Sequence, residues 1–119
     1  MKVLDSLVTQ SASIAAVRRD IHAHPELCFE ELRTSELVAK LLTDWGLEVH
    51  RGLGKTGVVG ILKNGTSTKA IGLRADMDAL PMQEFNQFEH ASKHAGKMHA
   101  CGHDGHVAML LAATQHLSK

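Results

Sequence analysis

The spacing of apolar residues changes at Gly46, and this change limits the fold more than any other feature of the sequence. Before Gly46, apolar side chains recur at three- and four-residue steps, which predicts amphipathic helices over residues 3–23 and 29–45. Pro25 separates the two helices, because the residue before a proline is pushed out of the helical region. Gly46 itself is expected to cap the second helix. The helical spacing returns over residues 105–119 and predicts a third helix.

Three segments between these helices have the composition of β-strands. They are residues 47–51, 57–63 and 69–74. Asn64-Gly65 is a strong turn signal, so we expect the second and third segments to form a loose hairpin. Residues 81–98 show no periodicity, and an irregular stretch of that length inside a compact domain is usually functional. The order of elements predicts an α/β domain, incomplete because three strands are fewer than a typical sheet contains.

Charge and composition exclude several classes of partner. Thirteen basic side chains balance thirteen acidic ones, and aromatic residues make up only 3% of the chain. The chain therefore has neither a positive stripe that could follow phosphate groups nor a platform for stacking bases. No apolar run approaches the roughly 20 residues of a membrane span, and two cysteines are too few for a secreted disulfide scaffold. We expect no nucleic-acid or membrane partner, and a cytoplasmic location.

The densest group of metal-ligand side chains lies in residues 99–106, His-Ala-Cys-Gly-His-Asp-Gly-His. Thiolate and imidazole groups are good ligands for zinc and other divalent transition metals. Cys101 and His103 can reach one ion only from an irregular or extended backbone, which Gly102 permits. Asp104 could supply a contact that orients the imidazole. A free cysteine in a buried turn beside solvent-facing histidines fits the spacing equally well.

Two other groups of ionisable side chains lie near the ends of predicted elements. Asp76 and Asp78 follow the third strand segment, and residues two apart on an extended chain face the same side. Ligands bind at such strand ends in α/β sheets, although a solvated pair of turn-forming aspartates also fits. His22 and His24 end the first helix. We expect them on the surface, because a helix C-terminus favours positively charged side chains there.

Taken together, these segments resemble the M20 peptidase family, and within it the hippurate hydrolase branch. The resemblance rests on RRDIHAHPELCFEE (18–31), GKTGVVG (54–60), LRADMDALPMQE (73–84) and HASKHAGKMHACGHDGHVAMLLAA (90–113), of which MHACGHDGH is the most specific. It implies that residues 1–119 are the N-terminal part of a mixed-sheet, zinc-exopeptidase-like catalytic domain. It also implies that a smaller dimerisation domain and the rest of the catalytic domain lie outside this chain.

The resemblance further implies a centre of one or two divalent ions, usually manganese or zinc and sometimes cobalt or nickel. Cys101 and His103 match the first two metal ligands, and Asp78 matches the catalytic carboxylate that braces the metal site. Asp76 stands where relatives outside this branch have a metal-binding histidine. The family's Glu-Glu pair and two later histidine ligands have no counterpart in these 119 residues. Cys28 stands where relatives usually have glycine.

The activity that the resemblance implies is metal-dependent hydrolysis of the amide bond of small N-acyl amino acids such as hippurate. The products are a carboxylic acid and a free amino acid, and the full-length enzyme would be a homodimer. One alternative is a truncated fragment without activity, and we expect this chain alone to lack amidase activity. Another alternative is a small zinc-binding module, which needs four ligands. In this chain they would be Cys101, His103, His99 and His106.

Overall fold

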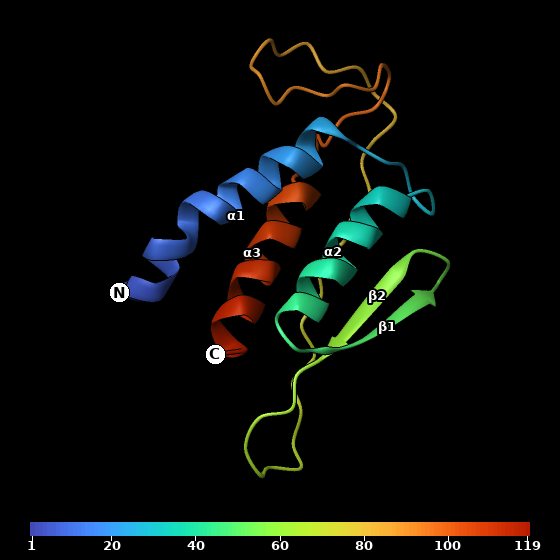
Figure 1. Cartoon of the computed structure of the whole chain (residues 1–119). Coiled ribbons are helices and arrows are strands. Elements are labelled where there is room, and N and C mark those ends of the chain that lie inside the picture. The colour runs from blue at the N-terminus through green and yellow to red at the C-terminus, as the bar shows by residue number, and fades with distance from the viewer.

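Three helices and one β-hairpin make up the regular structure of the chain. The computed structural model describes all 119 residues. The elements are α1 (Asp5–Ala23), α2 (Leu32–Asp44), β1 (Glu48–Leu53), β2 (Gly57–Ile61) and α3 (His103–Leu117). Helix α3 lies between α1 and α2, and the hairpin packs against α2 (Figure 1). The predicted α/β class is therefore confirmed.

The helices lie close to their predicted spans, and their ends have local causes. Helix α1 ends at Ala23, two residues before Pro25, as the steric effect of proline predicts. Helix α2 begins later than predicted, at Leu32, after Phe29 adopts a φ of 65° that no helical residue has. Gly46 follows α2 with a φ of 83°, which confirms its predicted role in ending that helix.

The strand pairing differs from the prediction. Strand β2 pairs with β1, not with residues 69–74, in an antiparallel register that places His50 opposite Val59. The connection is tight, because Gly54 and Lys55 both adopt positive φ angles, of 56° and 75°. Such a short connection closes with less loss of chain entropy than a longer loop.

Residues 69–74 form no strand, which contradicts the prediction. A strand is stabilised by hydrogen bonds to a neighbouring strand, and no other strand lies beside this segment. As a result Ile71 is 88% exposed and Leu73 is 60% exposed. Ile71 is the only β-branched residue of the segment, and no strand of the structure pairs with residues 69–74.

The apolar core is small and lies where the three helices meet the start of β1. It consists of five buried side chains, Ile21, Leu42, Leu47, Val107 and Leu111. Burial of each of these stabilises the fold by roughly 1.5–3 kcal/mol. Beside the core lies an open hollow of about 960 Å³ with 26 lining residues, 17 of them hydrophobic. Apolar side chains of α2, α3 and the hairpin therefore line an open hollow instead of being buried in the core.

Residues 62–102 contain no helix or strand, but two isolated β-bridges hold them in place. Leu27 pairs with Ala79 in parallel fashion, and Leu80 pairs with Met98 in antiparallel fashion. The backbone that directly follows Asp78 and the backbone three residues before Cys101 are thereby fastened. None of the helices has both the length and the apolar character required to cross a bilayer.

Candidate metal centre

His103 and Asp78 are brought into direct contact at the start of α3. The Nδ1 atom of His103 donates to Oδ1 of Asp78 at 2.9 Å and to the Asp78 carbonyl oxygen at 3.0 Å. Twenty-five residues separate the two positions, so the contact is tertiary. A histidine whose Nδ1–H is held by a carboxylate has its Nε2 lone pair free for a metal ion. The predicted roles of both residues are compatible with this geometry.

Cys101 lies in the turn that leads into α3, two residues before His103. Its thiol is free and exposed, not enclosed in a buried turn. Gly102 between them has a φ of 90° and a ψ of 13°, in the left-handed region. This is the irregular backbone that we expected a Cys-x-His pair to need, and only glycine adopts it without strain.

The types of ligand suit a divalent transition metal, but their number is too small to complete a metal site. Cys101 supplies a thiolate and His103 an imidazole, the two ligand types that zinc prefers. No three His, Cys, Asp or Glu side chains are grouped so that they could hold an ion together. His106 is exposed on the surface of α3. The four-ligand site of the zinc-module hypothesis is therefore not formed.

Asp76 does not join Asp78 at His103. It is partly exposed and forms an ion pair with Nη2 of Arg74 at 2.5 Å. The two aspartates therefore have different partners, and only Asp78 lies against the candidate metal ligand.

His22 lies in a buried charged network, contrary to the expectation of a surface histidine. Its Nδ1 atom contacts Oδ2 of Asp104 at 2.8 Å, and its Nε2 atom contacts Oε1 of Glu84 at 2.9 Å. Nε of Arg18 lies 3.2 Å from the same Asp104 oxygen. Two carboxylates, which cannot be buried without partners, overcome the tendency of a helix-end histidine to face water.

Glu84 is the main residue of this region that the sequence did not reveal. Although burial raises the pKa of its carboxyl group, hydrogen bonds from Asn86, from His22 and from the Ser92 N–H lower that pKa below the ordinary value. It is therefore a carboxylate at neutral pH. In the sequence it is one acidic residue in an aperiodic stretch, and no spacing marks it. Asp104 was predicted to orient a metal-bound imidazole, but its carboxylate contacts α1 instead.

His99 is buried, although the resemblance assigned it no role. Neither of its ring nitrogens has a hydrogen-bond partner, and burial lowers its pKa, which favours the neutral ring. Its ring centroid lies 6.4 Å from that of His22. His99 therefore lies beside His22, two residues before Cys101 in the chain.

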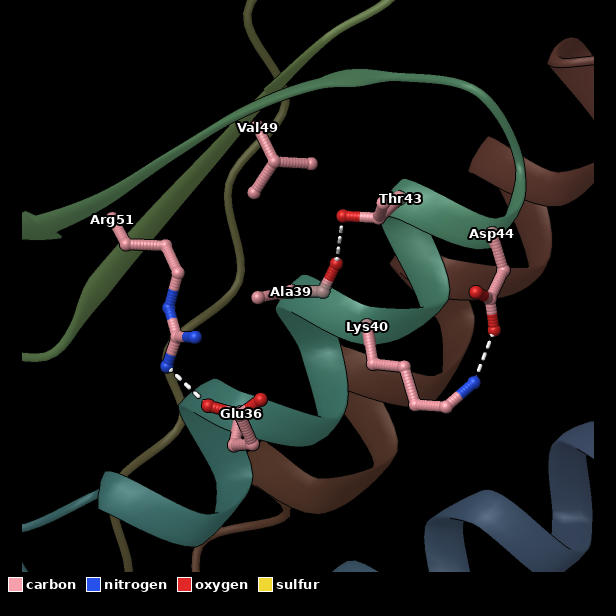
Figure 2. Close-up of a pocket in the computed structure, with 7 residues that line it drawn as sticks. All are labelled: Glu36, Ala39, Lys40, Thr43, Asp44, Val49 and Arg51. Atoms are coloured by element: carbon pink, nitrogen blue, oxygen red, sulfur yellow. Dashed lines mark hydrogen bonds and ion pairs between the residues drawn. The ribbon is translucent and has the colours of Figure 1, made fainter.

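Two hollows flank α2, and only one reaches the candidate centre. The hollow beside the core is lined by Asp78 and Cys28 as well as by apolar side chains. The other, of about 300 Å³, lies between α2 and β1 (Figure 2). It is bordered by exposed ion pairs, Arg51 with Glu36 at 2.7 Å and Lys40 with Asp44. None of the expected site residues lines this second hollow.

The sequence of this chain is similar to those of known hydrolases. Residues 72–119, which contain Asp78, Cys101 and His103, match the sequence profile of peptidase family M20/M25/M40. Hippurate hydrolase of Campylobacter jejuni is 49% identical over 118 residues, which is 99% of this chain and 31% of that protein. The N-acyl-L-amino acid amidohydrolase of Geobacillus stearothermophilus is 50% identical over 107 residues, 89% of this chain and 29% of that one.

The fold is similar to that of a solved relative. The crystal structure of a dinuclear metal-binding peptidase of the M20 family from Bacillus subtilis matches with a TM-score of 0.88 and 38% identity. The match covers 93% of this chain and 31% of that one. The chain thus spans about a third of the length of the relatives it matches. Over that part of their length, the sequence and the fold of this chain are those of peptidase family M20/M25/M40.

Proposed function

We propose that this chain supplies half of the divalent-metal centre of an N-acyl amino acid amidohydrolase. Cys101 and His103 are the proposed ligands, and Asp78 is the carboxylate that braces the centre. The observation that carries the proposal is the hydrogen bond of His103 Nδ1 to Asp78 at 2.9 Å, which leaves Nε2 free. The names of the relatives, hippurate hydrolase and N-acyl-L-amino acid amidohydrolase, support the reaction and the class of substrate.

Each residue of the half-site has a distinct part in the proposed chemistry. A bound divalent ion would lower the pKa of water and polarise the scissile carbonyl group. Asp78 keeps the proton of His103 on Nδ1 and makes the lone pair of Nε2 a better ligand for the metal ion. Cys101 would bind the ion as a thiolate, from the turn that contains Gly102. The donor types fit zinc, and they also fit manganese when carboxylate ligands complete the centre.

The remaining parts of the enzyme are proposed from the same relatives. Residues 1–119 would form the N-terminal part of the catalytic domain, and the other ligands, the proton-shuttling Glu and a dimerisation domain would lie outside them. The substrate would be a small N-acyl amino acid. The full-length protein would be a homodimer located in the cytoplasm. Because Cys101 and His103 supply only two donors, the 119 residues alone should bind metal weakly and turn over no hippurate.

A chimera tests the proposal directly. Residues 1–119 replace the matching segment of Campylobacter jejuni hippurate hydrolase, and hippurate hydrolysis is measured with added manganese or zinc. We expect activity in the chimera and its loss in the Cys101→Ser and His103→Ala variants. The Asp76→Asn variant is the matched control and should remain active. A folded, metal-loaded chimera that hydrolyses no N-acyl amino acid would refute the proposed function.

A further inference from the structure

We propose that His22 is a positioning residue of the metal centre, acting through Asp104 on the first turn of α3 and so on His103. The inference rests on the proposed function, because that function assigns His103 as a ligand. It assigns a role to a side chain that touches neither Cys101 nor His103.

The contact between His22 and Asp104 joins two helices that are far apart in the sequence. The residues are 82 positions apart, and their side chains meet at 2.8 Å with almost no exposure to solvent, 1% for Asp104. A buried carboxylate left without a partner is strongly destabilising. The C-terminal end of α1 lies near the N-terminal end of α3 (Figure 1), and the contact of His22 with Asp104 joins the two ends.

Asp104 does not cap helix α3. An acidic side chain in the first turn of a helix commonly caps it or interacts with its dipole. Helix α3 has no side-chain capping bond, and its N-cap residue is Gly102. The carboxylate of Asp104 instead contacts His22 by a hydrogen bond and Arg18 by an ion pair, both on α1.

The first turn of α3 is consequently held from two directions. Successive residues of a helix point about 100° apart. His103 contacts Asp78 in one direction, and Asp104 contacts His22 in another. If the pair of His22 and Asp104 is lost, the first turn of α3 gains freedom to rotate, and the His103 ring moves away from Asp78.

The second nitrogen of His22 extends the same restraint to the loop before Cys101. Glu84 accepts from His22 Nε2 and also from the backbone N–H of Ser92. This loop, residues 81–98, is closed at its base by the bridge of Leu80 to Met98, three residues before Cys101. The His22 ring thus joins α1, the first turn of α3 and the loop that leads to Cys101.

The first experiment uses the metal-free chain, so it does not depend on the proposed function. The hydrogen-bonded Nδ1–H of His103 is followed by ¹⁵N NMR in the wild type and in His22→Gln. We expect loss of that signal in His22→Gln, because the ring is no longer held against Asp78. Leu42→Ala is the control, since it destabilises the core without touching the network. An unchanged His103 signal in folded His22→Gln would overturn the inference.

The second experiment measures Co²⁺ binding through the thiolate-to-cobalt absorption band. His22→Gln and Asp104→Asn should each weaken binding by about tenfold, and the double variant by no more than either single one, because both remove the same contact. Leu42→Ala should bind as the wild type does. Equal affinity in wild type and His22→Gln would contradict the inference. A wild type whose band is unaffected by Cys101→Ser would instead contradict the ligand assignment.

Arg18→Gln covers the case in which His22→Gln does not fold. Arg18 contacts the same Asp104 oxygen, but its side chain is 43% exposed, so its replacement leaves less buried charge unpaired. We expect the same two changes, smaller in size. A folded Arg18→Gln and a folded Asp104→Asn that both keep the wild-type His103 signal would refute the role of the network.

Discussion

At the scale of single residues, the structure separates side chains that look equivalent in the sequence. Asp76 and Asp78 are two residues apart, yet one pairs with Arg74 in solvent and the other holds His103. The same holds for two glycines around His103. Gly102 needs a positive φ, whereas Gly105 lies inside α3 with an ordinary helical backbone. Replacements at these positions should therefore have unlike effects.

Replacement of Asp78 by Asn should weaken the binding of Co²⁺ or Zn²⁺ by about 10- to 100-fold. The amide no longer favours the tautomer with the proton on Nδ1 and no longer adds negative charge behind the ring. Titration calorimetry measures the affinity, and Asp76→Asn is the control that should bind normally. Equal losses in the two variants would contradict the distinction between them.

Replacement of Gly102 by Ala should lower the free energy of unfolding by about 1–2 kcal/mol, the cost of a side chain in the left-handed region. No atom lies within 4 Å of the added Cβ, so strain in the backbone is the whole effect. Gly105→Ala also meets no atom. It should stabilise α3 by roughly 0.5–1 kcal/mol. Urea unfolding of both variants measures the free energy of unfolding, which should fall in Gly102→Ala and rise in Gly105→Ala.

At the scale of elements, long-range polar contacts fasten the irregular loop 81–98 to the helices. Glu84 is the anchor of the loop, since it accepts from His22 on α1 and from Asn86 and Ser92 within the loop. Its carboxyl group has a lowered pKa in the folded chain. A carboxylate of this kind stabilises the fold above its ordinary pKa, and its contribution is lost as the pH falls through the folded pKa.

Stability should therefore depend on Glu84 in acid. Below neutrality, the unfolded chain takes up the proton at Glu84 before the folded chain does, so the free energy of unfolding falls as the pH is lowered from about 5. Glu84→Gln should be less stable than wild type at pH 7, and its stability should fall less steeply with acid. Thermal melts between pH 7 and pH 3 test this. Parallel pH profiles for the two proteins would exclude a lowered pKa at Glu84.

At the scale of the whole molecule, the chain exposes more apolar surface than its core can cover. Five core side chains lie beside a hollow of about 960 Å³, and the strand-like residues 69–74 have no partner. Large exposed apolar patches and unpaired strand-like segments promote association. The relatives are about three times as long as this chain.

The isolated chain should accordingly self-associate as its concentration rises. Replacing Ile71 and Leu73 by Lys adds charge to the exposed segment without touching the core, and it should shift the chain toward monomer in sedimentation velocity. The matched control, Val59→Lys, changes an exposed residue of the hairpin and should have a smaller effect. Equal sedimentation of the two variants would show that residues 69–74 do not drive association.

The sequence by itself determined the elements whose cause is local. Helical spacing placed α1, α2 and α3, Pro25 and Gly46 placed two helix ends, and the Cys101-Gly102-His103 spacing predicted an irregular or extended backbone at Gly102. Only the tertiary structure decided the partner of β2, the exposure of residues 69–74 and the burial of His22 between Asp104 and Glu84. The strand pairing depends on which neighbouring segment lies beside β2. The burial of His22 depends on contacts 62 and 82 positions apart, where two buried carboxylates that need partners outweigh the preference of a helix-end histidine for solvent. The spacing of residues along the chain does not indicate which distant residues will be in contact.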